Sequence, residues 1–170
     1  MEKYILVSLI YGVWMINYLS EEEIIELNKY SLFATGEDNE FHVMQPDDVR
    51  FLINLVKKEF SCDLLQKALG YCISIIVLHP FKNGNHRTSL LSAERFLLKN
   101  NYNLLSSNKE KIEFEKWRLK YEEENDLERE FFQITNIENT SKKTDKIMKM
   151  MDSRYGKETI NWLKKNYFKK

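Results

Sequence analysis

The chain has 170 residues, of which 43% are hydrophobic, and this is enough for a folded domain with a real core. Its 26 basic and 26 acidic residues cancel, so the overall charge gives no support to a nucleic-acid-binding protein. Two cysteines, Cys62 and Cys72, make no disulfide framework and lack the paired spacing of a zinc site, so we expect reduced thiols. The low counts of 5 glycines and 2 prolines favour a mostly helical fold.

The first segment, residues 4–19, is strongly apolar. It lacks the basic flank and the small-residue cleavage site of a signal peptide. It is also short for a membrane span and contains Ser8, Gly12 and Asn17. We interpret it as a buried strand or helix of a cytoplasmic protein, with a membrane-directed role as the less favoured alternative.

Helix signals follow in chain order. Ser20 and Glu23 have the spacing of a capping box, which predicts a helix over about 21–30. Residues 35–46 interrupt the helical pattern, and 41–44 within them fit a short strand or hairpin arm. Pro46 begins a second helix, whose apolar residues recur at helical spacing: Val49, Leu52, Ile53 and Val56.

The centre of the chain predicts two helices joined by a loop. Asp63 is the expected N-cap of a helix over residues 64–78. The second half of this helix is apolar on nearly every face, which is typical of a helix at the centre of a core. Asn83-Gly84 predicts a turn, and a new helix should run from near Arg87 to about residue 99.

The composition becomes charge-dense after about residue 107. Phe114, Trp117 and Tyr121 recur at helical spacing, which predicts an apolar face packed in a core. Two more helices are expected near 142–151 and 157–168. We therefore expect a packed helical extension rather than a disordered tail.

The segment 79–87, HPFKNGNHR, combines residue types that suit phosphate chemistry. Gly84 can adopt positive φ and obstructs no ligand, so that successive backbone N–H groups can surround an anion. The loop leads into a helix N-terminus, which favours phosphate, and Arg87 adds a fork of donors for phosphate oxygens. Asn85 can donate an amide hydrogen, and Phe81 should point inward and anchor the loop.

The same loop carries two of the three histidines of the chain. His79 can act as the general base that takes the proton from a hydroxyl attacking the bound phosphorus. A lone histidine at a helix end is more often structural, but the surrounding loop favours catalysis. For His86 two roles remain: it contacts phosphate when it is protonated, or it is a solvated loop residue. His42 is expected to be structural or exposed.

This loop resembles the signature of the Fic/Doc family, His-x-Phe-x-(acid or Asn)-(Gly or Ala)-Asn-x-Arg. The matching positions are His79, Phe81, Asn83, Gly84, Asn85 and Arg87. The resemblance covers about residues 20–105. It implies an all-α Fic/Doc helical fold with a short β-hairpin flap, a catalytic domain over 1–107 and a helical C-terminal extension over 108–170.

The resemblance also implies an enzyme that moves a phosphate-containing group from a nucleoside triphosphate to a protein hydroxyl. His79 would be the base, and the residues that bind phosphate would be Asn83, Gly84, Asn85, His86 and Arg87. Members that transfer AMP usually have an acid at 83, Gly at 86 and a second Arg at 90. This chain has Asn83, His86 and Leu90 there, and its Arg-Thr-x-Leu run at 87–90 is closer to the death-on-curing (Doc) branch, although that branch usually has Lys at 86. Phosphorylation is therefore favoured over AMP transfer.

Cofactors and partners follow from the same resemblance. ATP or another nucleoside triphosphate and Mg²⁺ are expected, although Asn83 at the metal position is a weaker ligand than a carboxylate. A flap near 40–44 would bind the protein substrate by strand addition. The inhibitory pattern (Ser/Thr)-x-x-x-Glu-(Gly/Asn) is not found in the sequence, so inhibition would come from a small antitoxin, as in toxin–antitoxin pairs. The alternative outside enzymes is a catalytically degenerate, protein-binding module, which Asn83 and His86 favour.

Overall fold

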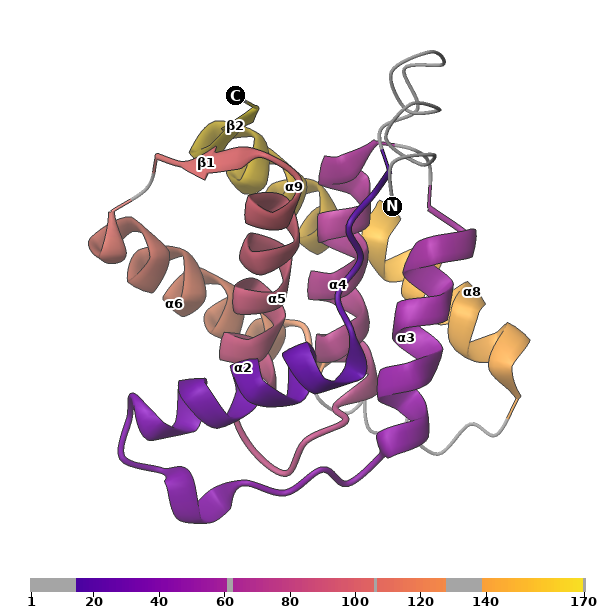
Figure 1. The fold of residues 1–170 in the computed structure, drawn as a ribbon, viewed down its shortest axis with the longest axis vertical. Helices are drawn as coiled ribbons and strands as arrows, with labels where there is room; N and C mark the ends of the chain where they lie inside the picture. The colour runs from indigo at the N-terminus through magenta and orange to yellow at the C-terminus, as the bar shows by residue number, and fades with distance from the viewer. Residues whose placement is uncertain (1–14, 61–62, 106, 128–138, 170) are drawn as a thin grey trace, which may run out of the picture.

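The computed structural model describes residues 15–60, 63–105, 107–127 and 139–169. The helices within these ranges are α2 (Glu21–Phe33), α3 (Pro46–Lys58), α4 (Leu64–Leu78), α5 (Asn85–Lys99), α6 (Asn108–Glu124), α8 (Thr140–Asp152) and α9 (Arg154–Asn166), with a 3-10 turn, η1 (Asp38–Glu40). Strands β1 (Tyr102–Leu104) and β2 (Tyr167–Lys169) pair in an antiparallel sheet. The all-α expectation is confirmed (Figure 1).

Most of the apolar segment 4–19 lies outside the described residues, so its interpretation stays a prediction. Leu19, at its end, is buried in the core. No helix in the described part of the chain has the length and apolar character needed to cross a membrane.

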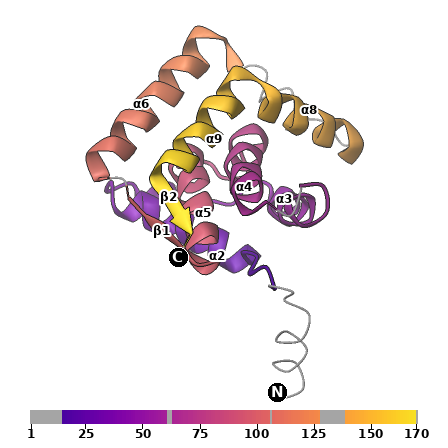
Figure 2. The ribbon, with the colours of Figure 1, turned by 90° about the horizontal axis from the view of Figure 1, so that it is seen from above.

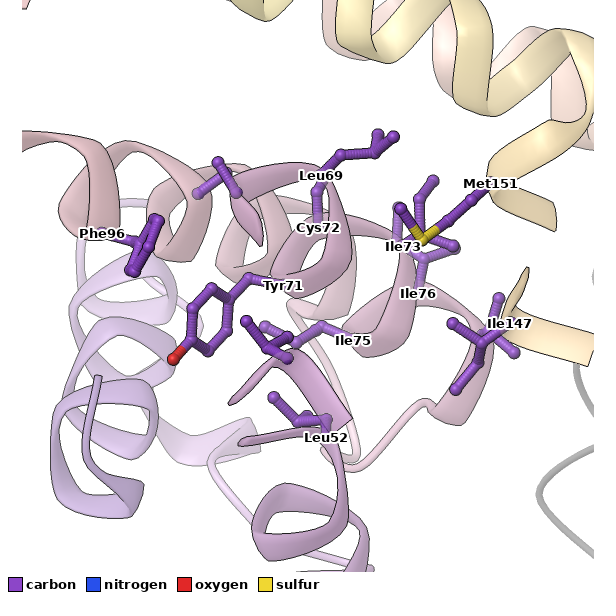
Figure 3. Packing of buried hydrophobic residues seen from close by; sticks show 14 of the residues in the cluster. Leu52, Leu69, Tyr71, Cys72, Ile73, Ile75, Ile76, Phe96, Ile147 and Met151 are labelled. Atoms are coloured by element: carbon purple, nitrogen blue, oxygen red, sulfur yellow. The ribbon is translucent and has the colours of Figure 1, made fainter. Parts of the chain in front are cut away.

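Helix α4 is the centre of the core. Every residue over 67–78 is buried, as expected for a helix that is apolar on nearly every face. Helices α3 and α5 pack on its two sides, and α8 and α9 cover it from above in Figure 2. Figure 3 shows Leu52 of α3, Phe96 of α5 and Ile147 of α8 around the side chains of α4. The helices before and after residue 107 therefore share one hydrophobic cluster.

Local signals set the helix ends. Ser20 and Glu23 form the predicted capping box, in which Ser20 Oγ accepts the Glu23 N–H at 3.2 Å and the Ser20 N–H donates to the Glu23 carboxylate at 2.9 Å. Asp63 caps α4 by accepting the Leu65 N–H at 2.8 Å. The predicted bounds of α2 and α4 are thus confirmed to within three residues at each end, and α3 begins at Pro46 as predicted.

Helix α5 begins at Asn85, two residues before the predicted start near Arg87. Gly84 takes the N-cap position with φ 77°, and its carbonyl accepts the Thr88 N–H at 2.9 Å. The first turn of α5 therefore contains Asn85, His86 and Arg87, which are three of the five residues predicted to bind phosphate.

Residues 41–44 do not form the predicted hairpin. They run beside the loop between α4 and α5, where Val43 and Phe81 make a single antiparallel β-bridge. The Met44 N–H donates to the Pro80 carbonyl at 2.9 Å. The residues just before this segment form η1 instead of a second strand arm, which leaves the segment without a hairpin partner.

The aromatic face of α6 packs against α9. The ring of Phe114 stacks on that of Trp162 with centroids 4.5 Å apart, and the ring of Tyr121 lies 5.7 Å from that of Tyr155. The two helices predicted near 142–151 and 157–168 are α8 and α9. The paired strands β1 and β2 fasten the end of the chain beside the end of α5 (Figure 1).

A buried lysine joins α4 to α3. Lys67 is 3% exposed, and its ammonium donates to the backbone carbonyls of Val56 at 2.8 Å and Phe60 at 3.0 Å. These carbonyls lie at the C-terminal end of α3, where unpaired acceptors and the helix dipole favour a cation.

Replacing this lysine tests the cap. Lys67→Met keeps the apolar stem but leaves the carbonyls without their donor, so we expect the free energy of unfolding to fall by about 1.5–3 kcal/mol in urea titrations. Lys58→Met changes an exposed lysine at the same helix end and should alter it by less than about 0.5 kcal/mol. Equal losses in the two variants would contradict the capping role.

Candidate active site

His79 ends α4 in a left-handed conformation, with φ 46° and its N–H donating to the Ile75 carbonyl at 3.0 Å. Such a conformation is uncommon for a residue other than glycine, and it turns the chain out of the helix towards Pro80. Nδ1 of His79 contacts the Ile76 carbonyl oxygen. Since a carbonyl only accepts, Nδ1 carries the proton, and Nε2 of the neutral ring is the nitrogen that can take one up.

Asn85 holds the loop in shape. Its Oδ1 accepts the Phe81 N–H at 3.1 Å, and its Nδ2 donates to the Phe81 carbonyl at 2.8 Å. Both residues are buried, and the ring of Phe81 belongs to the core cluster. The side chain of Asn85 thus closes the loop on itself; a contact between this amide and phosphate stays a prediction.

Helix α2 supports the loop from outside the motif. Asn28 is fully buried and donates from Nδ2 to the Asn83 carbonyl at 2.9 Å and to Thr88 Oγ1 at 3.0 Å. A Cβ on Gly84 would lie 3.0 Å from Asn28 Nδ2 and 3.0 Å from Ser31 Oγ. The loop therefore needs glycine at 84 for two reasons, its positive φ and the close approach of α2.

Asn83, the residue expected at the metal position, is engaged within the loop in this structure. Its Oδ1 accepts the Gly84 N–H at 2.7 Å, so the oxygen predicted to face a metal is bonded within the loop. The described residues contain no group of three or more His, Cys, Asp or Glu side chains that could hold a metal ion. The Glu37 carboxylate makes a hydrogen bond with the Asn83 side chain, so one oxygen ligand of the kind that Mg²⁺ prefers lies beside it.

Arg87, in the first turn of α5, meets a carboxylate. One of its terminal nitrogens lies 2.5 Å from Glu37 Oε2, and the other contacts Thr35 Oγ1. The hydrogen bonds that Glu37 accepts from the Thr35 hydroxyl and from Arg87 hold the pKa of the Glu37 carboxyl below its usual value. A phosphate group that approaches the same nitrogen of Arg87 would compete with this carboxylate.

His86 extends from the loop towards the C-terminal helices. Its Nε2 lies 2.5 Å from Oε2 of Glu122 on α6, and its ring centroid lies 5.8 Å from that of His79. Oε1 of Glu122 accepts the Tyr155 hydroxyl at 2.6 Å. Burial raises the pKa of Glu122, but the hydrogen bonds from His86 and Tyr155 and the charges of His86 and Arg118 outweigh it, so that this pKa lies below its usual value.

The structure thus brings the predicted residues to one loop and adds partners that the sequence did not reveal. Glu37 lies in a polar stretch without any distinguishing pattern, and Glu122 lies in a run of charged residues. Asn28 had a signal, because it is a polar residue on the buried face of α2 beside Ile24 and Leu32. Together the site offers a proton acceptor, the N–H groups at the start of α5 and the side chains of Arg87 and His86, which suits an anionic substrate.

Comparison with known proteins supports the sequence resemblance. Residues 18–97 match the model of the Fic/DOC family. The match begins just before α2, includes the whole loop 79–87 and ends in the last turn of α5. No curated protein and no solved structure matches the chain.

Two glycine variants separate backbone strain from crowding. Gly84 and Gly36 have φ 77° and 73°, but a Cβ on Gly36 would meet nothing within 4 Å. We expect Gly36→Ala to lower the free energy of unfolding by about 1–2 kcal/mol through conformation alone. Gly84→Ala should cost roughly 1–3 kcal/mol more because of overpacking against α2. Urea denaturation measures both, and equal losses would show that α2 accommodates the methyl group.

A second pair of variants tests the contact at Arg87. Glu37→Gln removes the competing carboxylate at nearly constant size, so pyrophosphate should bind several-fold more tightly in calorimetric titrations. Asp38→Asn removes the same charge from the next residue in the chain and serves as the control. An unchanged affinity in Glu37→Gln, or an equal gain in both variants, would contradict direct competition at Arg87.

Proposed function

We propose, from the match of residues 18–97 to the Fic/DOC family model, that this chain transfers a phosphate-containing group from a nucleoside triphosphate to a protein hydroxyl. Proteins with this fold are generally nucleotide-dependent transferases. The observation that carries the proposal is the state of His79, whose Nδ1 is held by the Ile76 carbonyl so that Nε2 is the proton acceptor. This base lies in the same loop as the start of α5.

In the proposed reaction, the backbone N–H groups at the start of α5 and the guanidinium of Arg87 hold the phosphate oxygens. Nε2 of His79 takes the proton of the attacking hydroxyl as its oxygen bonds to phosphorus. The bond from phosphorus to the departing oxygen breaks, and that oxygen leaves with the remainder of the nucleotide. Arg87 and protonated His86 stabilise the negative charge on the phosphate oxygens during the transfer.

We favour transfer of the terminal phosphate, as in the Doc branch, with AMP transfer as the alternative. The side-chain oxygen Oδ1 of Asn83 accepts the Gly84 N–H in the loop, and His86 adds a side chain where AMP-transferring members have glycine. Both features support a nucleotide placed differently from that of AMP-transferring members.

The proposed protein substrate lies along residues 41–44. This segment is joined to the loop by the Val43–Phe81 bridge. Phe81 is two residues after His79 in the sequence. Strand addition to such a segment would bring a substrate hydroxyl near the base. A small inhibitory protein partner, as in toxin–antitoxin pairs, belongs to the same proposal.

Labelled ATP tests the reaction. With a soluble cell extract as the source of acceptor proteins, we expect label from the γ-phosphate, and none from the α-phosphate, to reach protein. Label from the α-phosphate would instead establish AMP transfer. His79→Ala should reduce transfer by at least about 100-fold, because general-base catalysis contributes this much or more.

Binding provides the control for that variant. His79→Ala should bind pyrophosphate as tightly as the unchanged protein, since the N–H groups of α5 and Arg87 remain. Transfer at an unchanged rate in His79→Ala would contradict the base assignment. If neither label is transferred and His79→Ala keeps its full biological effect, the chain is a binding module and not an enzyme.

A further inference from the structure

A closed ring of hydrogen bonds connects the loop to the helices after residue 107. Nε2 of His86 donates to Glu122, whose other oxygen accepts the Tyr155 hydroxyl at 2.6 Å. Nε of Arg118 donates to the Tyr155 oxygen at 2.8 Å, and its Nη2 donates to Ser89 Oγ at 2.7 Å. Ser89 Oγ then donates to the His86 carbonyl at 2.6 Å. The ring thus begins and ends at His86.

Two carboxylates, Glu115 and Glu122, make the ionic contacts of this ring. Arg118, which is fully buried, has Glu115 as an ion-pair partner at 3.0 Å. Glu122 makes its closest ionic contact with His86, and its side chain is only 7% exposed. Burying a carboxylate costs several kcal/mol unless it is paired and hydrogen-bonded, and Glu122 meets this condition through His86 and the Tyr155 hydroxyl. Within the ring, Glu122 is the residue that contacts the imidazole of His86, so it links α6 directly to the loop.

The geometry around His86 indicates what the glutamate does. The ring of His86 lies 5.8 Å from that of His79 in a T-shaped arrangement and stands in the first turn of α5. With Nε2 bound to Glu122, the orientation of the ring is fixed, and Nδ1 is the nitrogen left to donate to an acceptor. A phosphate oxygen is such an acceptor, and the doubly protonated ring can donate to it and to Glu122 together.

We propose that Glu122 is a positioning residue that orients His86 towards a phosphate oxygen of the substrate, so that α6 completes the phosphate site of the loop. This inference rests on the proposed function, because it requires phosphate to bind at the start of α5. It gives the helices after residue 107 a part in substrate binding, in addition to their part in the core.

A double-mutant cycle tests the coupling. Pyrophosphate affinity is measured by calorimetry for the unchanged protein, Glu122→Gln, His86→Gln and the double variant. Glu122→Gln should weaken binding about tenfold, the effect of one charge-assisted hydrogen bond. In the His86→Gln background the same change should have no effect, because Glu122 acts only through His86.

Glu115→Gln is the matched control. It removes an equal charge from the same helix. Glu115 pairs with Arg118, which belongs to the ring, but it makes no contact with His86. We expect it to lower the melting temperature while pyrophosphate affinity stays within twofold of that of the unchanged protein. An equal loss of affinity in Glu115→Gln and Glu122→Gln would reduce Glu122 to a structural role and overturn the proposal.

The outcomes separate this inference from the proposed function. If the unchanged protein binds pyrophosphate and Glu122→Gln binds it equally well, or if Glu122→Gln has the same effect in both backgrounds, only the positioning role falls. If the unchanged protein binds no pyrophosphate, the proposed phosphate site falls and the inference falls with it. Should Glu122→Gln unfold at the titration temperature, Glu122→Asp takes its place in the cycle, because it keeps the charge but shortens the reach to His86.

Discussion

The burial of α4 on all sides is the constraint on which the rest of the structure depends. Residues 67–78 pack against helices from both halves of the described chain, so the helix cannot rotate or shift without opening the core (Figure 3). Its C-terminal end is therefore a fixed point, and His79 leaves it in a left-handed conformation. The amide of Asn85 then closes the loop on Phe81, and α5 starts at a set distance from the histidine. A base on such a support keeps its orientation without help from a substrate.

Two carboxylates contact the side chains of Arg87 and His86, and their surroundings give them different roles. The side chain of Glu37 is 41% exposed, so water and salt weaken its attraction to Arg87, and an incoming phosphate can replace it at small cost. Glu122 is buried and bonded on both oxygens, so displacing it would leave a carboxylate without partners in a poorly solvated place. Phosphate binding is therefore expected to exchange the partner of Arg87 and to retain the partner of His86.

The sequence predicted those parts of the fold that local chemistry determines. Ser20, Asp63 and Pro46 each mark a helix start through groups within three residues, and the apolar run of α4 requires a central position whatever surrounds it. The contacts of the site did not follow in the same way. Glu37 and Arg87 lie 50 residues apart, and His86 and Glu122 lie 36 apart, so these pairs form only after α2 and α6 have packed. No periodicity or spacing in a single sequence encodes such a pairing.

The predicted hairpin and the observed bridge also show that a single sequence does not reveal which segments pair. Residues 41–44 have the composition of a strand, but a strand needs a partner, and composition does not name it. The partner is the loop 79–87, at Phe81, so the segment that the sequence assigned to substrate binding also pairs with this loop. A substrate that pairs with this segment would therefore contact the backbone that positions His79. Substrate binding and the alignment of the base would then be coupled through one short stretch of main chain.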